Sequence, residues 1–123
     1  MEPDWNDNQP IYRQLRDRVV AMILEDVLSE GDSLPSVRKV AAEYQINPLT
    51  VLKAYQALQD EGLVEKRRGR GMFVSKGALK RLRKSERDVF LQEEWPLIRD
   101  KIERLGLDPE ELLRDFNKSG DGQ

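Results

Sequence analysis

The chain has 123 residues, a length that suits one ordinary domain or a small domain with an appendage and excludes a large multidomain enzyme. Its residues are 38% hydrophobic and 36% charged with a net charge of −2, which is typical of a globular protein and excludes a fibre. It contains no cysteine and no histidine, so disulfides, thiolate metal sites and Cys or His nucleophiles are excluded.

The sequence offers no signal for a membrane or an export pathway. No apolar run approaches the ~20 residues that cross a bilayer. The first residues, MEPDWNDNQ, are acidic where a secretory signal is basic and then apolar. We therefore expect a cytoplasmic protein without membrane association. We also expect no cofactor.

The charged residues are unevenly distributed along the chain. Residues 66–87 contain ten Lys and Arg and one acidic residue, whereas the segments before and after are acidic. Such a local positive field attracts a polyanion even when the whole chain is slightly acidic. The alternative is a solvated charged helix face, which suits Lys80–Arg87 better than Lys66–Arg70, where glycines interleave.

A first helix is predicted between Pro10 and Leu28. Apolar residues recur there at three- or four-residue spacing, which indicates a helix with one buried face. Pro10 suits the first turn because its missing N–H leaves no helical hydrogen bond unmade. The segment SEGDSLPS, with its glycine, proline and serines, then ends the pattern.

Two further helices follow at close spacing. Ser36 is the expected N-cap of a short second helix. Asn47 and Pro48, an N-cap residue followed by proline, begin a third helix that ends at Gly62. Two helices joined by a turn of three or four residues are a helix-turn-helix.

A β-hairpin is predicted directly after the third helix. LVEK and MFVS are strand candidates around RRGRG, whose glycines permit the positive φ of a hairpin tip. The order helix, helix, helix, hairpin predicts a winged helix-turn-helix, so we expect a mainly α fold with a small β-hairpin. We assign residues 1–76 to this domain.

The rest of the chain is predicted to be helical. We expect a helical dimerisation segment over residues 77–118, with a kink or break near Trp95 caused by Pro96, and a disordered tail over residues 119–123. This segment is too small to enclose a drug-sized cavity, so its apolar stripe is a surface for a second copy. The alternative is packing onto the first helix of the same chain. The expected dimer contacts are Leu82, Val89, Phe90, Trp95, Leu97, Ile98, Ile102 and Leu105.

The third helix and the hairpin carry the candidate DNA contacts. At 100° per residue, Leu49, Lys53 and Gln56 lie opposite the apolar side, where a helix-turn-helix faces the major groove. The arginines of the hairpin suit a narrow minor groove. For single residues the alternative is plain capping or solvation. The full candidate set is Ser36, Arg38, Lys39, Asn47, Thr50, Lys53, Arg67, Arg68, Gly69 and Arg70.

Four segments, QPIYRQL, LPSVRKVA, INPLTVLKAYQALQDEGLV and GRGMFV, together resemble the N-terminal domain of GntR-family bacterial transcription regulators. RLGLDPEELL is similar to the YtrA-like subfamily. The resemblance implies a dimeric regulator that often controls neighbouring transporter genes, with DNA contacts at Arg38, Thr50, Lys53 and Arg68–Arg70. The sequence departs from the family pattern at Leu49 and Leu52, where polar or basic residues are usual, and Leu49 suits a thymine methyl instead.

We therefore expect a repressor that occupies a palindromic operator on double-stranded DNA as a homodimer. The alternative is a winged-helix module that binds a protein partner, and salt-sensitive, sequence-dependent DNA binding distinguishes the two. An enzyme has little support because no Walker-type phosphate loop is present. The sequence identifies no small-molecule effector.

Overall fold

The computed structural model describes residues 5–121, with side chains through residue 118. The chain divides into two units, Met1–Lys84 and Ser85–Gln123. The mainly helical fold with a hairpin after a helix-turn-helix is confirmed. Its elements are α1 (Ile11–Leu24), α2 (Val37–Tyr44), α3 (Pro48–Asp60), β1 (Val64–Arg67), β2 (Gly71–Val74), α4 (Ala78–Val89), the π-helical turn η1 (Phe90–Glu94), α5 (Trp95–Arg104) and α6 (Pro109–Asp121).

The helices α2 and α3 form the helix-turn-helix, and each begins at the predicted cap. The Ser36 hydroxyl accepts a hydrogen bond of 3.1 Å from the backbone N–H of Lys39. The Asn47 side chain accepts one of 2.9 Å from the backbone N–H of Leu49. Gln45 turns the chain between the helices in a left-handed conformation with a φ of 55°.

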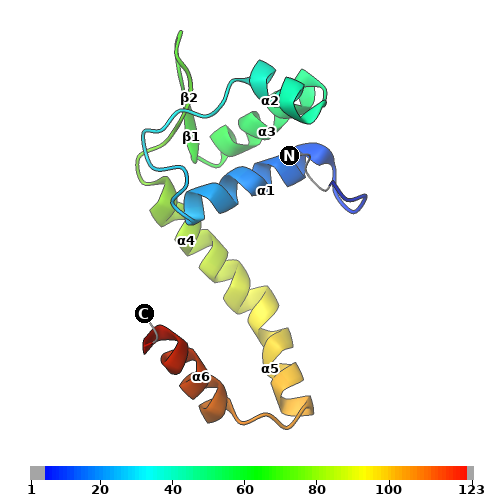
Figure 1. Cartoon of the computed structure of the whole chain (residues 1–123), viewed down its shortest axis with the longest axis vertical. Helices are drawn as coiled ribbons and strands as arrows, with labels where there is room; N and C mark the ends of the chain where they lie inside the picture. The colour runs from blue at the N-terminus through cyan, green and yellow to red at the C-terminus, as the bar shows by residue number, and fades with distance from the viewer. Residues whose placement is uncertain (1–4, 122–123) are drawn as a thin grey trace. The chain divides into compact units, whose positions relative to one another are not determined.

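The core of the first unit lies between α1, α2, α3, the hairpin and the start of α4 (Figure 1). Val51, Ala54 and Leu58 on one side of α3 are fully buried, each with 0% of its surface exposed. Burial of apolar surface is the dominant stabilising contribution in such a core. One side of α3 is therefore held firmly by packing, and the other side remains available for contacts.

A hydrogen-bonded ion pair joins α1 to the end of α3. The Nε of Arg16 donates a hydrogen bond of 2.8 Å to Glu61 Oε2, and Nη2 of the same guanidinium donates to Oε1. These bonds raise the pKa of Arg16 above its ordinary value. The pairing is bidentate, which is the geometry in which an exposed ion pair contributes most to the stability of the fold.

The first helix is shorter than the sequence predicts. It ends at Leu24 because Asp26 takes a left-handed conformation with a φ of 62°, and the N–H groups of Val27 and Leu28 then both donate to the Met22 carbonyl. Val27 is consequently 62% exposed and does not extend the buried face of the helix.

The loop after α1 adds a third line of backbone hydrogen bonds to the hairpin. β1 and β2 pair antiparallel, with Val64 opposite Val74 and Arg67 opposite Gly71. The N–H of Leu34 donates to the Met72 carbonyl over 2.8 Å, and Asp32 accepts from the Val74 N–H over 2.8 Å. The strand β2 is thus hydrogen-bonded along both of its edges, whereas the tip of the hairpin extends beyond the helices (Figure 1).

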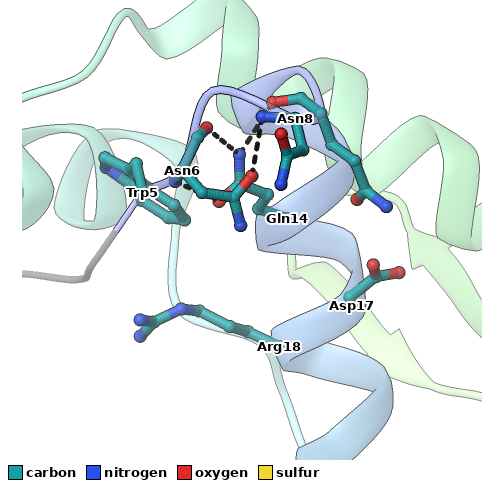
Figure 2. Close-up of a pocket in the computed structure, with 7 residues that line it drawn as sticks. Trp5, Asn6, Asn8, Gln14, Asp17 and Arg18 are labelled. Atoms are coloured by element: carbon teal, nitrogen blue, oxygen red, sulfur yellow. Dashed lines mark hydrogen bonds between the residues drawn. The ribbon is translucent and has the colours of Figure 1, made fainter.

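The segment before α1 is fastened by Gln14. Its side chain accepts a hydrogen bond of 3.0 Å from the Asn6 N–H and donates to the carbonyls of Asn6 and Gln9 over 2.9 and 2.7 Å (Figure 2). The Trp5 ring packs edge-on against Tyr44 of α2, with centroids 6.0 Å apart. An open hollow of about 450 Å³ lies beside this segment, and Gln14 is one of the residues that line it.

Near Trp95, where the sequence predicts a kink or break, the second unit has a π-helical turn. η1 replaces a regular turn immediately before α5, and the N–H of Trp95 donates to the carbonyl of Phe90, five residues earlier. The wider turn accommodates the ring of Pro96, which clashes with the preceding turn of a regular helix. At α6 the Asp108 side chain accepts a hydrogen bond of 3.0 Å from the Glu110 N–H.

The predicted tail, residues 119–123, overlaps the end of α6, whose backbone runs to Asp121. Residues 122 and 123 lie outside the described part of the chain.

Candidate nucleic-acid interface

The outward face of α3 is the first part of the candidate interface. Tyr55, Val51, Ala54 and Leu58 fill the buried side, so the side chains on the opposite arc point away from the core. Leu49 is 69% exposed and begins that arc in the first turn. The outward arc contains Leu49, Leu52, Lys53, Gln56 and Asp60, all of which are exposed.

Lys53 lies toward α1. Its Nζ is 4.2 Å from the centroid of the Tyr12 ring, a distance that indicates a cation–π contact. The positive charge is therefore held at the α1 side of the outward arc of α3, close to the half-buried Thr50. Tyr12 was not among the predicted site residues, because contact between α1 and α3 is not visible in the sequence pattern.

Ser36 and Asn47 are occupied as helix caps. Their side-chain oxygens accept hydrogen bonds from backbone N–H groups of α2 and α3. Both residues are exposed, and the remaining free N–H groups of each first turn favour a nearby anion such as a phosphate. Arg38 and Lys39 are exposed in the first turn of α2, beside the Ser36 cap.

The hairpin tip is formed by Arg68, Gly69 and Arg70 between the two strands. The Arg70 N–H donates a hydrogen bond of 2.8 Å to the Arg67 carbonyl and closes the turn. Gly69 and Gly71 have φ values of 75° and 104°, which other residues rarely adopt. The glycines therefore shape the turn, as the sequence predicts, and both arginines at the tip are exposed.

The three arginines of the hairpin differ in their surroundings. Arg67 lies over the Phe73 ring, with its guanidinium carbon 4.3 Å from the centroid, and its Nε is 3.9 Å from Glu65. Within the described part of the chain, no carboxylate lies within ion-pairing distance of Arg68 or Arg70. The charges of these two residues are thus available to an external anion.

A groove of about 370 Å³ separates α3 from the hairpin. Its floor is apolar and includes Tyr55, whose hydroxyl donates a hydrogen bond of 2.7 Å to the Pro35 carbonyl. Burial raises the pKa of Tyr55 to about 12, so this hydroxyl stays protonated. The residues lining the groove are Leu34, Ser36, Val37, Leu52, Tyr55, Gln56, Gln59, Lys66, Arg70, Gly71 and Met72.

Of the polar residues of this groove, Gln56 was expected on the outward face of α3, whereas Gln59 and Lys66 were not assigned to the site from the sequence. Gln56 and Gln59 project from α3, and Lys66 projects from β1. Successive side chains of a strand point to opposite faces, so Lys66 lies on the other face of β1 from Glu65 and Arg67. This alternation can be read from the sequence. The groove therefore combines amide and cationic groups at its rim with an apolar floor.

The second unit carries an exposed apolar surface. No residue between 85 and 118 is buried in the structure, and most of the apolar side chains there are exposed. The rings of Phe90 and Trp95 lie 6.4 Å apart, and Ile102 is half-buried. The large exposed apolar residues are Val89, Phe90, Leu91, Trp95, Leu97, Ile98, Leu105, Leu107, Leu112, Leu113 and Phe116.

Leu82 does not belong to this surface, contrary to its predicted role in dimer contacts. It is 2% exposed and packs with Ala78 in the core of the first unit. The helical spacing of Leu82 and Val89 is continuous across the division between the units, so periodicity alone does not show which partner covers each residue.

Among the described residues, no group of three or more His, Cys, Asp and Glu side chains is arranged to hold a metal ion. Over the same part of the chain, every helix is too short or too polar to span a bilayer.

The model of the family described as bacterial regulatory proteins, gntR family, matches residues 11–74. These residues run from the first residue of α1 to the last residue of β2, so the match spans the helix-turn-helix and its hairpin.

Similarity to individual proteins extends beyond the hairpin. The chain is 30% identical over 122 residues to YhcF, an uncharacterised helix-turn-helix transcriptional regulator of Bacillus subtilis strain 168, and the match covers 99% of each protein. It is 32% identical over 105 residues to the transcriptional repressor YtrA of the same strain, covering 85% of this chain and 75% of YtrA. The crystal structure of a transcriptional regulator from Oenococcus oeni superposes with a TM-score of 0.72 and 32% identity, covering 94% of this chain and 95% of the other.

Proposed function

We propose that this chain represses transcription by occupying a palindromic operator as a homodimer. The chain is a DNA-binding transcription regulator and belongs to the gntR family of bacterial regulatory proteins. Its similarity to YhcF and YtrA along most of the chain identifies the YtrA-like subfamily. Membership of this regulator family also means that the chain is not an enzyme. The proposal depends mainly on one observation: the exposed outward face of α3 stands beside a hairpin tip whose Arg68 and Arg70 have uncompensated charge.

Major-groove recognition by α3 is supported by its packing and its caps. The buried side of α3 is fixed in the core, so the opposite arc enters a groove without disturbing the fold. Gln56 suits the N6 and N7 edge of adenine, and Lys53 suits a guanine edge or a phosphate. The capped first turns of α2 and α3 and the exposed Arg38 and Lys39 suit the flanking phosphates.

Minor-groove contact by the wing is supported by its charge and shape. Arg68 and Arg70 stand on a narrow tip that two glycines make possible. A guanidinium is attracted to a narrow minor groove because the negative potential is strongest there. Arg67, held over Phe73, keeps the strand in place and contributes charge near the backbone.

A homodimer is supported by the second unit. Apolar surface without a partner is costly in water, and so many large exposed apolar side chains in one unit mark an interaction site. A second copy supplies the same surface, which a twofold axis makes self-complementary. We assign DNA binding to residues 1–76 and dimerisation to residues 77–118, except that the first turns of α4 also complete the core of the first unit. Two half-sites then lie about 34–36 Å apart on one face of the duplex.

Repression in the cytoplasm is the simplest regulatory outcome for this arrangement. Occupation of a promoter by a dimer blocks access to it and requires no bound cofactor. The relative YtrA is named as a repressor, which supports the same sign of regulation for this chain.

The experiment that tests the proposal is selection of random-sequence duplex DNA by the purified full-length protein. We expect enrichment of an inverted repeat, bound by two copies of the chain, with an affinity that falls steeply as salt rises. Binding without sequence enrichment would contradict the proposal and favour the winged-helix module that binds a protein partner.

A further inference from the structure

The apolar residues on the outward arc of α3 are unusual within their unit. Among the described residues of the first unit, the large apolar side chains that are exposed are Val27, Leu49 and Leu52, and two of these three stand on α3. Leu49 is 69% exposed in the first turn, and Leu52 is 42% exposed one turn later. Residues three apart lie side by side on a helix, so the two leucines form one apolar strip.

The surroundings of this strip show where it points. Leu52 lines the groove between α3 and the hairpin together with Gln56 and Arg70, which belong to the candidate nucleic-acid interface. The N–H of Leu49 is bound by the Asn47 side chain, and Asn47 begins the helix end that enters a major groove first. The leucines therefore occupy the positions of α3 from which base edges are read.

The chemistry of base edges restricts what a leucine recognises. A leucine side chain neither donates nor accepts a hydrogen bond. In the major groove, the one apolar group among the four base pairs is the C5-methyl group of thymine. A leucine that replaces water around this methyl group gains hydrophobic contact, whereas opposite an amino or carbonyl group it leaves a polar group without its water.

We propose that Leu49 and Leu52 are specificity-determining residues that contact thymine C5-methyl groups in each half-site of the operator. This inference rests on the proposed function, because it assumes that α3 enters the major groove. With Gln56 suited to adenine on the same arc, the half-site read by α3 is rich in A·T pairs.

The test compares thymine with deoxyuridine, which pairs with adenine in the same way and lacks only the C5-methyl group. In the duplex selected by the full-length protein, each thymine of a half-site is replaced in turn, and the symmetric position is replaced with it. We expect at least one replacement to weaken wild-type binding about fourfold per half-site, the factor for one buried methyl group.

The variants Leu49→Ala and Leu52→Ala connect the loss to a particular side chain. Each variant is expected to bind the thymine duplex more weakly and to lose the preference for thymine over deoxyuridine at one position. The loss of affinity from the leucine change and the loss from the deoxyuridine change are then not additive. Val27→Ala is the matched control, because Val27 is 62% exposed and lies outside the helix-turn-helix. It should keep the full wild-type discrimination.

The possible failures are distinguishable. If the wild type enriches a site and binds every deoxyuridine duplex as tightly as the thymine duplex, the inference is wrong and the proposed function stands. The inference is equally wrong if both leucine variants discriminate as the wild type does. If the wild type enriches no sequence at all, the proposed function fails and this inference fails with it.

Discussion

The guanidinium of Arg81 in α4 donates a hydrogen bond of 2.6 Å to the carbonyl oxygen of Gly62, which lies just after α3. The same Nη2 atom donates a hydrogen bond of 3.1 Å to the carbonyl of Lys76, after β2. The Glu30 carboxylate accepts a hydrogen bond of 2.6 Å from the N–H of Gly77, the residue directly before α4. One arginine thus connects α4 to both the end of α3 and the end of the hairpin.

Replacing Arg81 with alanine should lower the free energy of unfolding by about 1 kcal/mol, because two carbonyls lose a charged donor at an exposed site. Arg83→Ala is the control, since Arg83 is exposed on the same helix. Urea unfolding of the two variants measures the difference. Equal stability of both variants would show that the hydrogen bonds of Arg81 contribute nothing.

Burial of Tyr55 gives stability a defined dependence on pH. Its pKa rises from 10.0 to about 12 in the folded chain, first because burial disfavours the tyrosinate and second because of Tyr44. A folded-state pKa above the unfolded value gives stability that is fully present below pH 10 and is lost as pH rises toward about 12.

Tyr55→Phe should therefore show a smaller loss of stability between neutral pH and about pH 11 than the wild type does. At neutral pH the variant should be about 1 kcal/mol less stable, because the Pro35 carbonyl loses its donor. Urea unfolding at a series of pH values measures both effects, with Tyr12→Phe as the control. Parallel pH profiles for the wild type and Tyr55→Phe would show that ionisation of Tyr55 does not cause the loss of stability at alkaline pH.

The tip of the wing should control the salt dependence of DNA binding. The double variant Arg68→Ala, Arg70→Ala should bind the operator more weakly, and the slope of log affinity against log salt should become shallower by up to about 2. The matched control is Arg99→Ala, Arg114→Ala, which removes the same charge from exposed positions in the second unit. If both double variants change the slope equally, net charge and not the wing is responsible.

The backbone conformation of Gly71 should matter for DNA binding as well as for stability. Gly71→Ala adds a methyl group that meets no atom within 4 Å, so its effect comes from the φ of 104°. We expect a loss of about 1–2 kcal/mol in the free energy of unfolding and weaker operator binding. Gly31→Ala is matched, because Gly31 has a φ of 89° with no atom within 4 Å. It should lose stability and keep DNA affinity, and equal DNA affinity of the two variants would contradict a role for the turn.

The apolar surface of the second unit should hold the dimer. Ile98→Asp places a charge among exposed apolar side chains and should convert the dimer to monomers, because an unpaired charge is costly in an apolar interface. Sedimentation equilibrium measures the change, with Asp100→Asn on the same helix as the control. A dimer that persists in Ile98→Asp would place the interface elsewhere.

Local sequence signals were sufficient for much of the fold. The caps at Ser36 and Asn47 and the glycine-shaped hairpin follow from side-chain chemistry within a few residues, and the structure contains them. The end of α1 was missed because Asp26 takes a positive φ that its residue type permits but does not require. The π-helical turn before Pro96 shows how a chain accommodates proline within a helix without breaking it.

The parts of the candidate site that escaped sequence analysis depend on contacts between distant residues. Lys53 reaches the Tyr12 ring, and the groove brings Lys66 beside Gln56 and Gln59. Leu82 continues the apolar spacing of the second unit but is covered by the first. Periodicity identifies which side of a helix is apolar, whereas the partner that covers it is decided by tertiary packing.

The most direct test of sequence-specific DNA binding by this winged helix is the ratio of two dissociation constants at physiological salt. One is measured for the selected duplex, and the other for a duplex of the same composition in shuffled order. We predict that the selected duplex binds at least about a thousandfold more tightly, the lower range for specific DNA-binding proteins. A ratio near one would contradict recognition through α3, because phosphate contacts alone do not distinguish the two duplexes.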